Sequence, residues 1–166
     1  PHDISRRQRQ MCIRDREILA SILSVGRNSR LVKILKEDSN LVESVYVDVN
    51  AGELGGLFIM EASCESKDID LVEKQINKTI DEISNCKALA LDEIKKAINI
   101  VKSNYIFNLE TSTQLSSFFG NELLWGRKSS INNLESHLKY WNDLDNFKEI
   151  TEYIRGEKFT LVASPM

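Results

Sequence analysis

The stretch SVYVDVNAGELGGLFIMEASC, residues 44–64, decides the fold, because here the apolar residues change from a helical period to alternation. Two alternating runs flank the glycine-rich loop AGELGG, and this pattern predicts an antiparallel hairpin. The loop is longer than a two-residue turn, so its length alone does not fix the register of the strands. The residues expected to share one face are Val45, Val47, Val49, Phe58, Met60, Ala62 and Cys64.

Helical periods flank the hairpin on both sides. Apolar residues recur every three or four positions, which is typical of helices with one buried face. Candidate caps are Asn28 or Ser29 for the second helix and Ser66 for the third. The expected helices cover residues 17–25, 29–38, 66–83, 91–109, 115–124, 130–141 and 143–154, and a final strand covers 158–164.

Strands and helices are segregated along the chain rather than alternating. This order predicts an α+β fold, with an antiparallel-rich sheet covered on one face by helices. Three strands are few for an independent sheet and leave an open edge, so we expect further N-terminal strands upstream. An open edge with exposed apolar surface also predicts self-association. The aromatic residues Phe118, Phe119 and Trp125 are expected to pack in the core.

The first sixteen residues differ from the rest of the chain. RRQRQMCIRDR, residues 6–16, is basic and has no apolar period. Its end resembles translated adapter sequence, so we expect residues 1–16 to be a non-native or disordered leader and residues 17–166 to be the domain. The alternative interpretation is a basic arm that binds an acidic partner.

The charge and the cysteines limit the possible partners and compartments. The net charge is −3, but the leader carries +3 and the remaining residues −6, so the body is acidic. We therefore expect neither nucleic acid nor a membrane as partner, and no apolar run approaches the roughly 20 residues of a membrane span. Cys12, Cys64 and Cys86 are scattered without a CxxC pair and are expected to be reduced thiols. The compartment stays open, although reduced thiols favour the cytoplasm.

No cluster of catalytic or metal-ligating residues is visible in the sequence. The histidines are His2, in the leader, and His137, which has no second ligand at a suitable spacing. HExxH, HxxEH and paired Cys/His motifs are absent, and so are GxSxG, Walker and GxGxxG loops. We therefore expect no catalytic residue, no metal ligand and no cofactor in this chain.

Three segments resemble a known family when their order and spacing are taken together. ILSVGRNSRLVKILKEDSNLVESVYVDVN (22–50) resembles the pattern iLGGGxxSRLxxxLRExxgLaYsVxa, and GGLFIMEASCES (55–66) resembles a GxFxI strand followed by a helix. EIKKAINIVKSNYIFNLE (93–110) resembles a long helix that begins EL, and LLWG (123–126) resembles a later turn. These are features of the C-terminal half-domain of the insulinase-like, or mitochondrial-processing-peptidase-like, zinc metallopeptidases.

The resemblance implies one half of a clamshell built from two related α+β halves. In active members the other half holds zinc through HxxEH and a downstream Glu, and the HxxEH Glu activates a water molecule. Zinc is therefore expected in a partner half, either in cis or as a partner subunit in trans. This chain would close the chamber and hold a peptide substrate against that half. The alternative is a non-catalytic structural or assembly subunit of the same family.

The second half often donates an Arg and a Tyr to the substrate, and the resemblance places these positions at Lys36 and Glu43. Both residues depart from the pattern. Lysine offers charge without a bidentate fork, and an ionised Glu only accepts hydrogen bonds. Lys36 and Glu43 are therefore candidate substrate-binding residues, and a pair of solvated charges is the alternative. Arg30, in the SRL motif, is expected to tie the second helix to a neighbouring element.

Overall fold

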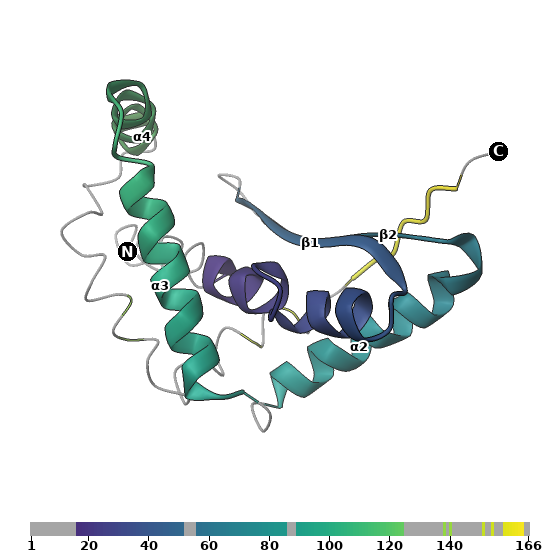
Figure 1. Ribbon diagram of the computed structural model, residues 1–166. Coiled ribbons are helices and arrows are strands. Elements are labelled where there is room, and N and C mark those ends of the chain that lie inside the picture. The colour runs from purple at the N-terminus through teal and green to yellow at the C-terminus, as the bar shows by residue number, and fades with distance from the viewer. Residues whose placement is uncertain are drawn as a thin grey trace, which may run out of the picture.

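The computed structural model of the protein (Figure 1) is an α+β arrangement built around an antiparallel hairpin, which confirms the expected fold class. The structure describes residues 16–51, 56–85, 89–124, 138, 140, 151, 154 and 158–164. The elements are a helix over residues 16–24, η1 (Val32–Asp38), β1 (Val42–Ala51), β2 (Gly56–Cys64), η2 (Ser66–Asp68), α2 (Ile69–Ser84), α3 (Leu91–Phe107) and α4 (Ser112–Leu124).

The hairpin has the faces that the alternation predicts. β1 and β2 pair antiparallel along their length, and the inner-face pairs bring the three valines of β1 opposite apolar residues of β2. Figure 1 shows helix 16–24, η1 and α2 together on one face of this hairpin. The inner-face pairs are Val45 with Ala62, Val47 with Met60 and Val49 with Phe58.

The core lies between the hairpin and the helices. The first helix turns its apolar stripe inward, and α2 and α3 each contribute one buried row, because apolar side chains three and four positions apart share a helix face. Leu138 joins this cluster as well. The buried residues from the helices include Ile18, Leu19, Ile22, Leu23, Leu31, Leu35, Val72, Ile83, Ile94, Ile98 and Val101.

The second helix differs from the regular α-helix that the sequence predicts. Most of it, η1, is a π-helix of seven residues. The hydroxyl of Ser29 donates to the carbonyl of Gly26 at 2.7 Å, so it does not cap the helix. Ser66 likewise begins a short 3-10 turn, and α2 starts three residues later with Asp68 at its N-cap. Both capping predictions are therefore wrong.

The long helical region divides between the two helices expected over residues 91–109 and 115–124. α3 ends at Phe107, and α4 continues after a turn in a new direction (Figure 1). Phe118 is half-buried and lies edge-on to Tyr105, with ring centroids 5.7 Å apart, whereas Phe119 is exposed. The prediction that these phenylalanines pack in the core is wrong, because α4 lies away from the hairpin; Trp125 lies outside the described residues.

The last described segment is not the strand that its alternation predicts. Among the described residues the sheet consists of β1 and β2, and residues 158–164 belong to no strand. The leader through residue 15 and most of the two helices expected between 130 and 154 lie outside the described residues. No helix in the described part of the chain has the length and apolar character of a membrane span.

Candidate functional site

Lys36 lies on the last turn of η1, with its side chain exposed at the helix end. Its neighbour Leu35 is fully buried and anchors this turn in the core. The Leu41 amide donates to the Leu35 carbonyl at 2.8 Å, and Asn40 takes a φ of 50°, in the left-handed region that asparagine tolerates. This turn ends the helix and leads the chain directly into β1.

Glu43 occupies a β-bulge at the start of β1. Val42 pairs with Cys64 and Ser44 pairs with Ser63, so Glu43 is the extra residue on its strand. The bulge changes the alternation locally, and both Val42 and Val45 are consequently buried although they are three residues apart. The Glu43 side chain remains exposed.

The structure brings the two predicted site residues together. The Nζ of Lys36 donates a hydrogen bond to the backbone carbonyl of Glu43 at 2.7 Å. A lysine ammonium has three donors, so two remain for another molecule. The adjacent Glu43 carboxylate can accept hydrogen bonds from peptide amides. The site therefore presents paired donors and acceptors at the beginning of β1.

Arg30 forms a fixed link to α3 rather than a second binding group. Its Nε donates to Oε1 of Glu93 at 3.2 Å, and its Nη2 donates to Oε2 at 2.8 Å. The Arg30 side chain is 14% exposed. Glu93 also accepts the backbone amide of Ala90 at 3.1 Å, which caps α3. The expectation that Arg30 ties the second helix to a neighbouring element is confirmed.

Glu93 has a pKa below its ordinary value of 4.5, although two effects oppose each other. Partial burial is the largest single influence and raises the pKa of Glu93, because burial disfavours the carboxylate. The hydrogen bond from Arg30, the amide of Ala90 and the charge of Arg30 together outweigh burial and lower it. The carboxylate is therefore held ionised by its partners.

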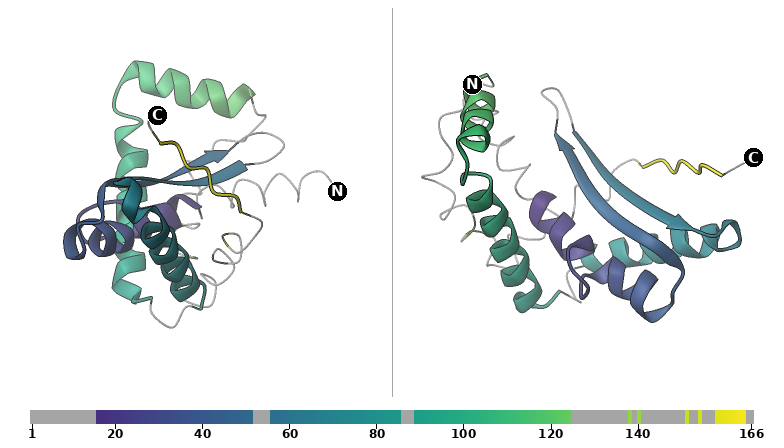
Figure 2. Two further views of the ribbon diagram at one scale, coloured as in Figure 1. Left: turned by 90° about the vertical axis from the view of Figure 1, so that its right-hand side faces the viewer. Right: turned by 45° about the horizontal axis from the view of Figure 1, so that its top comes forward.

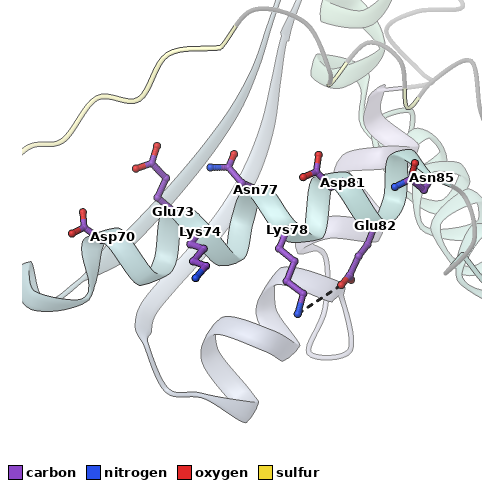
Figure 3. A pocket seen from close by; sticks show the side chains of 8 residues that line it. All are labelled: Asp70, Glu73, Lys74, Asn77, Lys78, Asp81, Glu82 and Asn85. Carbon is purple, nitrogen blue, oxygen red and sulfur yellow. Dashed lines mark ion pairs between the residues drawn. The ribbon is translucent and has the colours of Figure 1, made fainter.

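The polar face of α2 forms a shallow hollow with no arrangement for chemistry (Figure 3). Acidic, basic and amide side chains project from successive turns, and Lys78 forms a 4.0 Å ion pair with Glu82. In the part of the chain that the structure describes, no three His, Cys, Asp or Glu side chains could hold a metal ion. The lining residues are Asp70, Glu73, Lys74, Asn77, Lys78, Asp81, Glu82 and Asn85.

Sequence reasoning missed the bulge, which sets the geometry at Lys36 and Glu43. A signal was present, because Val42 and Val45 are both apolar at a spacing of three, which breaks strict alternation. The π-helix had no comparable signal, since its sequence, VKILKED, has an ordinary helical period. The contact from Lys36 to the Glu43 carbonyl depends on both features.

The fold and the site define a protein of the α+β class whose exposed lysine and glutamate meet at a strand start. The family described as Peptidase M16 inactive domain matches residues 15–101, just over half of the chain. The chain therefore belongs to this family, the inactive C-terminal half-domain of the insulinase-like and processing-peptidase-like metallopeptidases.

Two curated relatives agree with this assignment. An uncharacterised zinc protease of Streptomyces coelicolor is 28% identical over 118 residues, which is 70% of this chain and 26% of that protein. Mitochondrial-processing peptidase subunit alpha-2 of Dictyostelium discoideum is 29% identical over 103 residues, or 62% of this chain and 22% of that protein. The chain thus spans about a quarter of the length of these relatives.

A solved structure supports the fold. The crystal structure of a protease from Helicobacter pylori matches 86% of this chain with a TM-score of 0.71, at 15% sequence identity. The match covers 34% of that protease. At this identity the likeness concerns the fold alone.

Proposed function

We propose that this chain is the non-catalytic half of a two-part zinc peptidase, and that it closes the chamber and holds an extended peptide against a zinc-bearing half. Membership in the inactive-domain family supports the non-catalytic role. The relative called a zinc protease supports a zinc-dependent parent. The partner half is supplied either in cis or in trans, and zinc there provides the activated water.

The observation that carries the binding role is the 2.7 Å hydrogen bond from Lys36 to the Glu43 carbonyl. This contact holds the ammonium beside the start of β1. The expectation that these residues contact a substrate comes from the resemblance of residues 22–50 to the family pattern. The two remaining Lys36 donors would bind peptide carbonyls, and the Glu43 carboxylate would accept a peptide amide. Neither group is placed to move a proton, so their contribution would be to peptide affinity.

Reconstitution with a zinc-bearing half of the family tests this proposal. The mixture, or the joined chain, should cleave an unstructured peptide, and a chelator should abolish cleavage. Lys36→Ala should raise KM about three- to fivefold with little change in kcat, because an exposed charged hydrogen bond contributes about 1 kcal/mol. Lys33→Ala is the matched control, since Lys33 is also an exposed lysine of η1. Equal KM values for the two variants would remove Lys36 from the binding site.

A structural or assembly role within the same family is the second candidate. The departures at Lys36 and Glu43 favour it, because a scaffold does not need a pair that binds substrate. The relative that is named as a subunit, the alpha-2 subunit of Dictyostelium, is consistent with it. A stable complex with the zinc-bearing half that cleaves no peptide in any combination would support this second role and contradict the first.

A further inference from the structure

Arg27 forms an ion pair that reaches from the loop before η1 to the last turn of η1. Its Nε donates to Oε2 of Glu37 at 2.7 Å, and its Nη2 lies 2.7 Å from the same oxygen. Glu37 directly follows Lys36, the candidate binding residue. The Arg27 side chain is 82% exposed and that of Glu37 is 29% exposed. A surface contact thus connects the loop to the helical turn that carries Lys36.

The loop that carries Arg27 is held by hydrogen bonds. Gly26 has a φ of 88°, a left-handed conformation that glycine adopts without strain. The amide and the hydroxyl of Ser29 both donate to the Gly26 carbonyl, at 3.0 and 2.7 Å, and Ser29 is buried. Arg27 therefore projects from a turn that is anchored to the body of the protein.

The π-helical form of η1 determines which side chain faces Arg27. A π-helix has hydrogen bonds between residues five apart, whereas an α-helix has them between residues four apart. In the π-form, Glu37 faces Arg27, and the Nζ of Lys36 reaches the Glu43 carbonyl at 2.7 Å. π-turns are rare and often lie at functional sites, so a specific interaction is expected to stabilise this one.

An α-helical form would exchange the two charges at the end of η1. Because an α-helix has fewer residues in each turn, every later side chain would move by one position around the axis. Lys36 would then take the direction that Glu37 has now, and it would leave the Glu43 carbonyl. Two cations, Lys36 and Arg27, would meet and repel each other. The charge of Arg27 therefore favours the π-form over the α-form.

Two other hydrogen bonds also close the end of η1. The Ser39 hydroxyl donates to the Ile34 carbonyl, and the Leu41 amide donates to the Leu35 carbonyl at 2.8 Å. Both bonds are between uncharged groups. They cannot discriminate between a lysine and a glutamate at the position that faces Arg27, whereas the guanidinium can.

We propose that Arg27, through its ion pair with Glu37, selects the π-helical register of η1 and thereby positions Lys36 at the start of β1. Arg27 and Glu37 are positioning residues, because they act through Lys36. The expected effect on peptide affinity rests on the proposed function of Lys36, whereas the effect on the position of Lys36 can be measured in this chain alone.

Nuclear magnetic resonance of the full chain tests the positioning. The carbonyl carbon-13 resonance of Glu43 reports the hydrogen bond from Lys36, and Lys36→Ala gives the resonance without this bond. Arg27→Gln should move the resonance toward that of Lys36→Ala. Arg27→Glu should move it further, because a carboxylate at position 27 attracts Lys36 into the α-register. Arg27→Lys keeps the charge and should leave the resonance near its wild-type position.

Lys33→Gln is the matched control, since it removes another exposed cation of η1 and should not move the Glu43 resonance. The Arg27 variants should unfold in urea as the wild type does, because exposed ion pairs contribute little to global stability. A Glu43 resonance that is unchanged in both Arg27→Gln and Arg27→Glu overturns the proposal. An equal movement in Lys33→Gln also overturns it.

Kinetics with a zinc-bearing half separate this proposal from the proposed function. Arg27→Gln should raise KM about three- to fivefold with little change in kcat, as Lys36→Ala does. The double variant should be no worse than Lys36→Ala, because residues that act through one another are not additive. A Glu43 resonance that moves as expected while KM stays constant would uphold the positioning and contradict the peptide-binding role of Lys36.

Discussion

Arg30 and Glu93 connect two segments that are 63 residues apart in the sequence. The guanidinium approaches the carboxylate with two hydrogen bonds, which is the geometry that distinguishes arginine from lysine. Because the same carboxylate also accepts the Ala90 amide, one side chain both caps α3 and fixes it to the second helix. This link holds the helical layer beneath the hairpin.

The lowered pKa of Glu93 predicts acid sensitivity. Its folded pKa is lower than its unfolded value, so its contribution is complete above about pH 4.5 and is lost as the pH falls through the folded pKa. Urea unfolding of the wild type should therefore show a steeper loss of stability below pH 4.5 than Glu93→Gln shows. The glutamine variant is the control, because its amide oxygen can still accept the Ala90 amide. Parallel pH profiles for the two proteins would contradict this prediction.

A serine hydroxyl of the first helix forms a hydrogen bond with the edge of β1. Ser24 donates to the Ala20 carbonyl at 3.3 Å and accepts the Val47 amide at 2.9 Å. An edge strand has a row of unpaired backbone groups, and this contact satisfies one of them. The Val49 amide is satisfied differently, by the Asp48 carboxylate at 2.8 Å. The edge of β1 is thus protected by side chains rather than by a strand.

Replacing Ser24 tests this contact between the two elements. Ser24→Ala should lower the free energy of unfolding by about 1 kcal/mol, because the Val47 amide loses its partner. Amide hydrogen exchange at Val47 should become faster. Ser116→Ala is the matched control, since its hydroxyl bonds only the Ser112 carbonyl within α4 and is exposed. Unchanged exchange at Val47 in Ser24→Ala would show that the hydroxyl does not protect the edge.

Across the whole molecule, the helical layer is wider than the hairpin. α3 lies beside the hairpin, and α4 runs in a new direction from the end of α3 (Figure 2). α4 consequently exposes large apolar side chains, with Leu123 at 78% and Leu124 at 81%. Contiguous exposed apolar surface of this kind marks a contact surface or a risk of aggregation.

Changing this surface should alter hydrophobic dye binding without altering stability. Leu123→Gln with Leu124→Gln should reduce the fluorescence of a dye that binds apolar patches. The free energy of unfolding should stay within about 0.5 kcal/mol of wild type, as is usual for exposed positions. A larger loss of stability would mean that these leucines pack against another part of the chain.

Much of the fold could be predicted from local pattern. The inner face of the hairpin, the buried rows of the helices and the break before α4 all follow from apolar spacing, because spacing fixes which side chains share a face. Lys36 and Glu43 could be selected by resemblance. Their contact could not, because it depends on a bulge and a π-helix that small differences in packing produce.

The sequence by itself determined which residues face inward within each element, because the helix and strand periods are properties of a single segment. Only the tertiary structure decided which elements meet. Residues 158–164 have the alternation of a strand, yet strand pairing requires the backbone of a second segment, and in the described residues they instead contact α2 through Lys158 and Thr160.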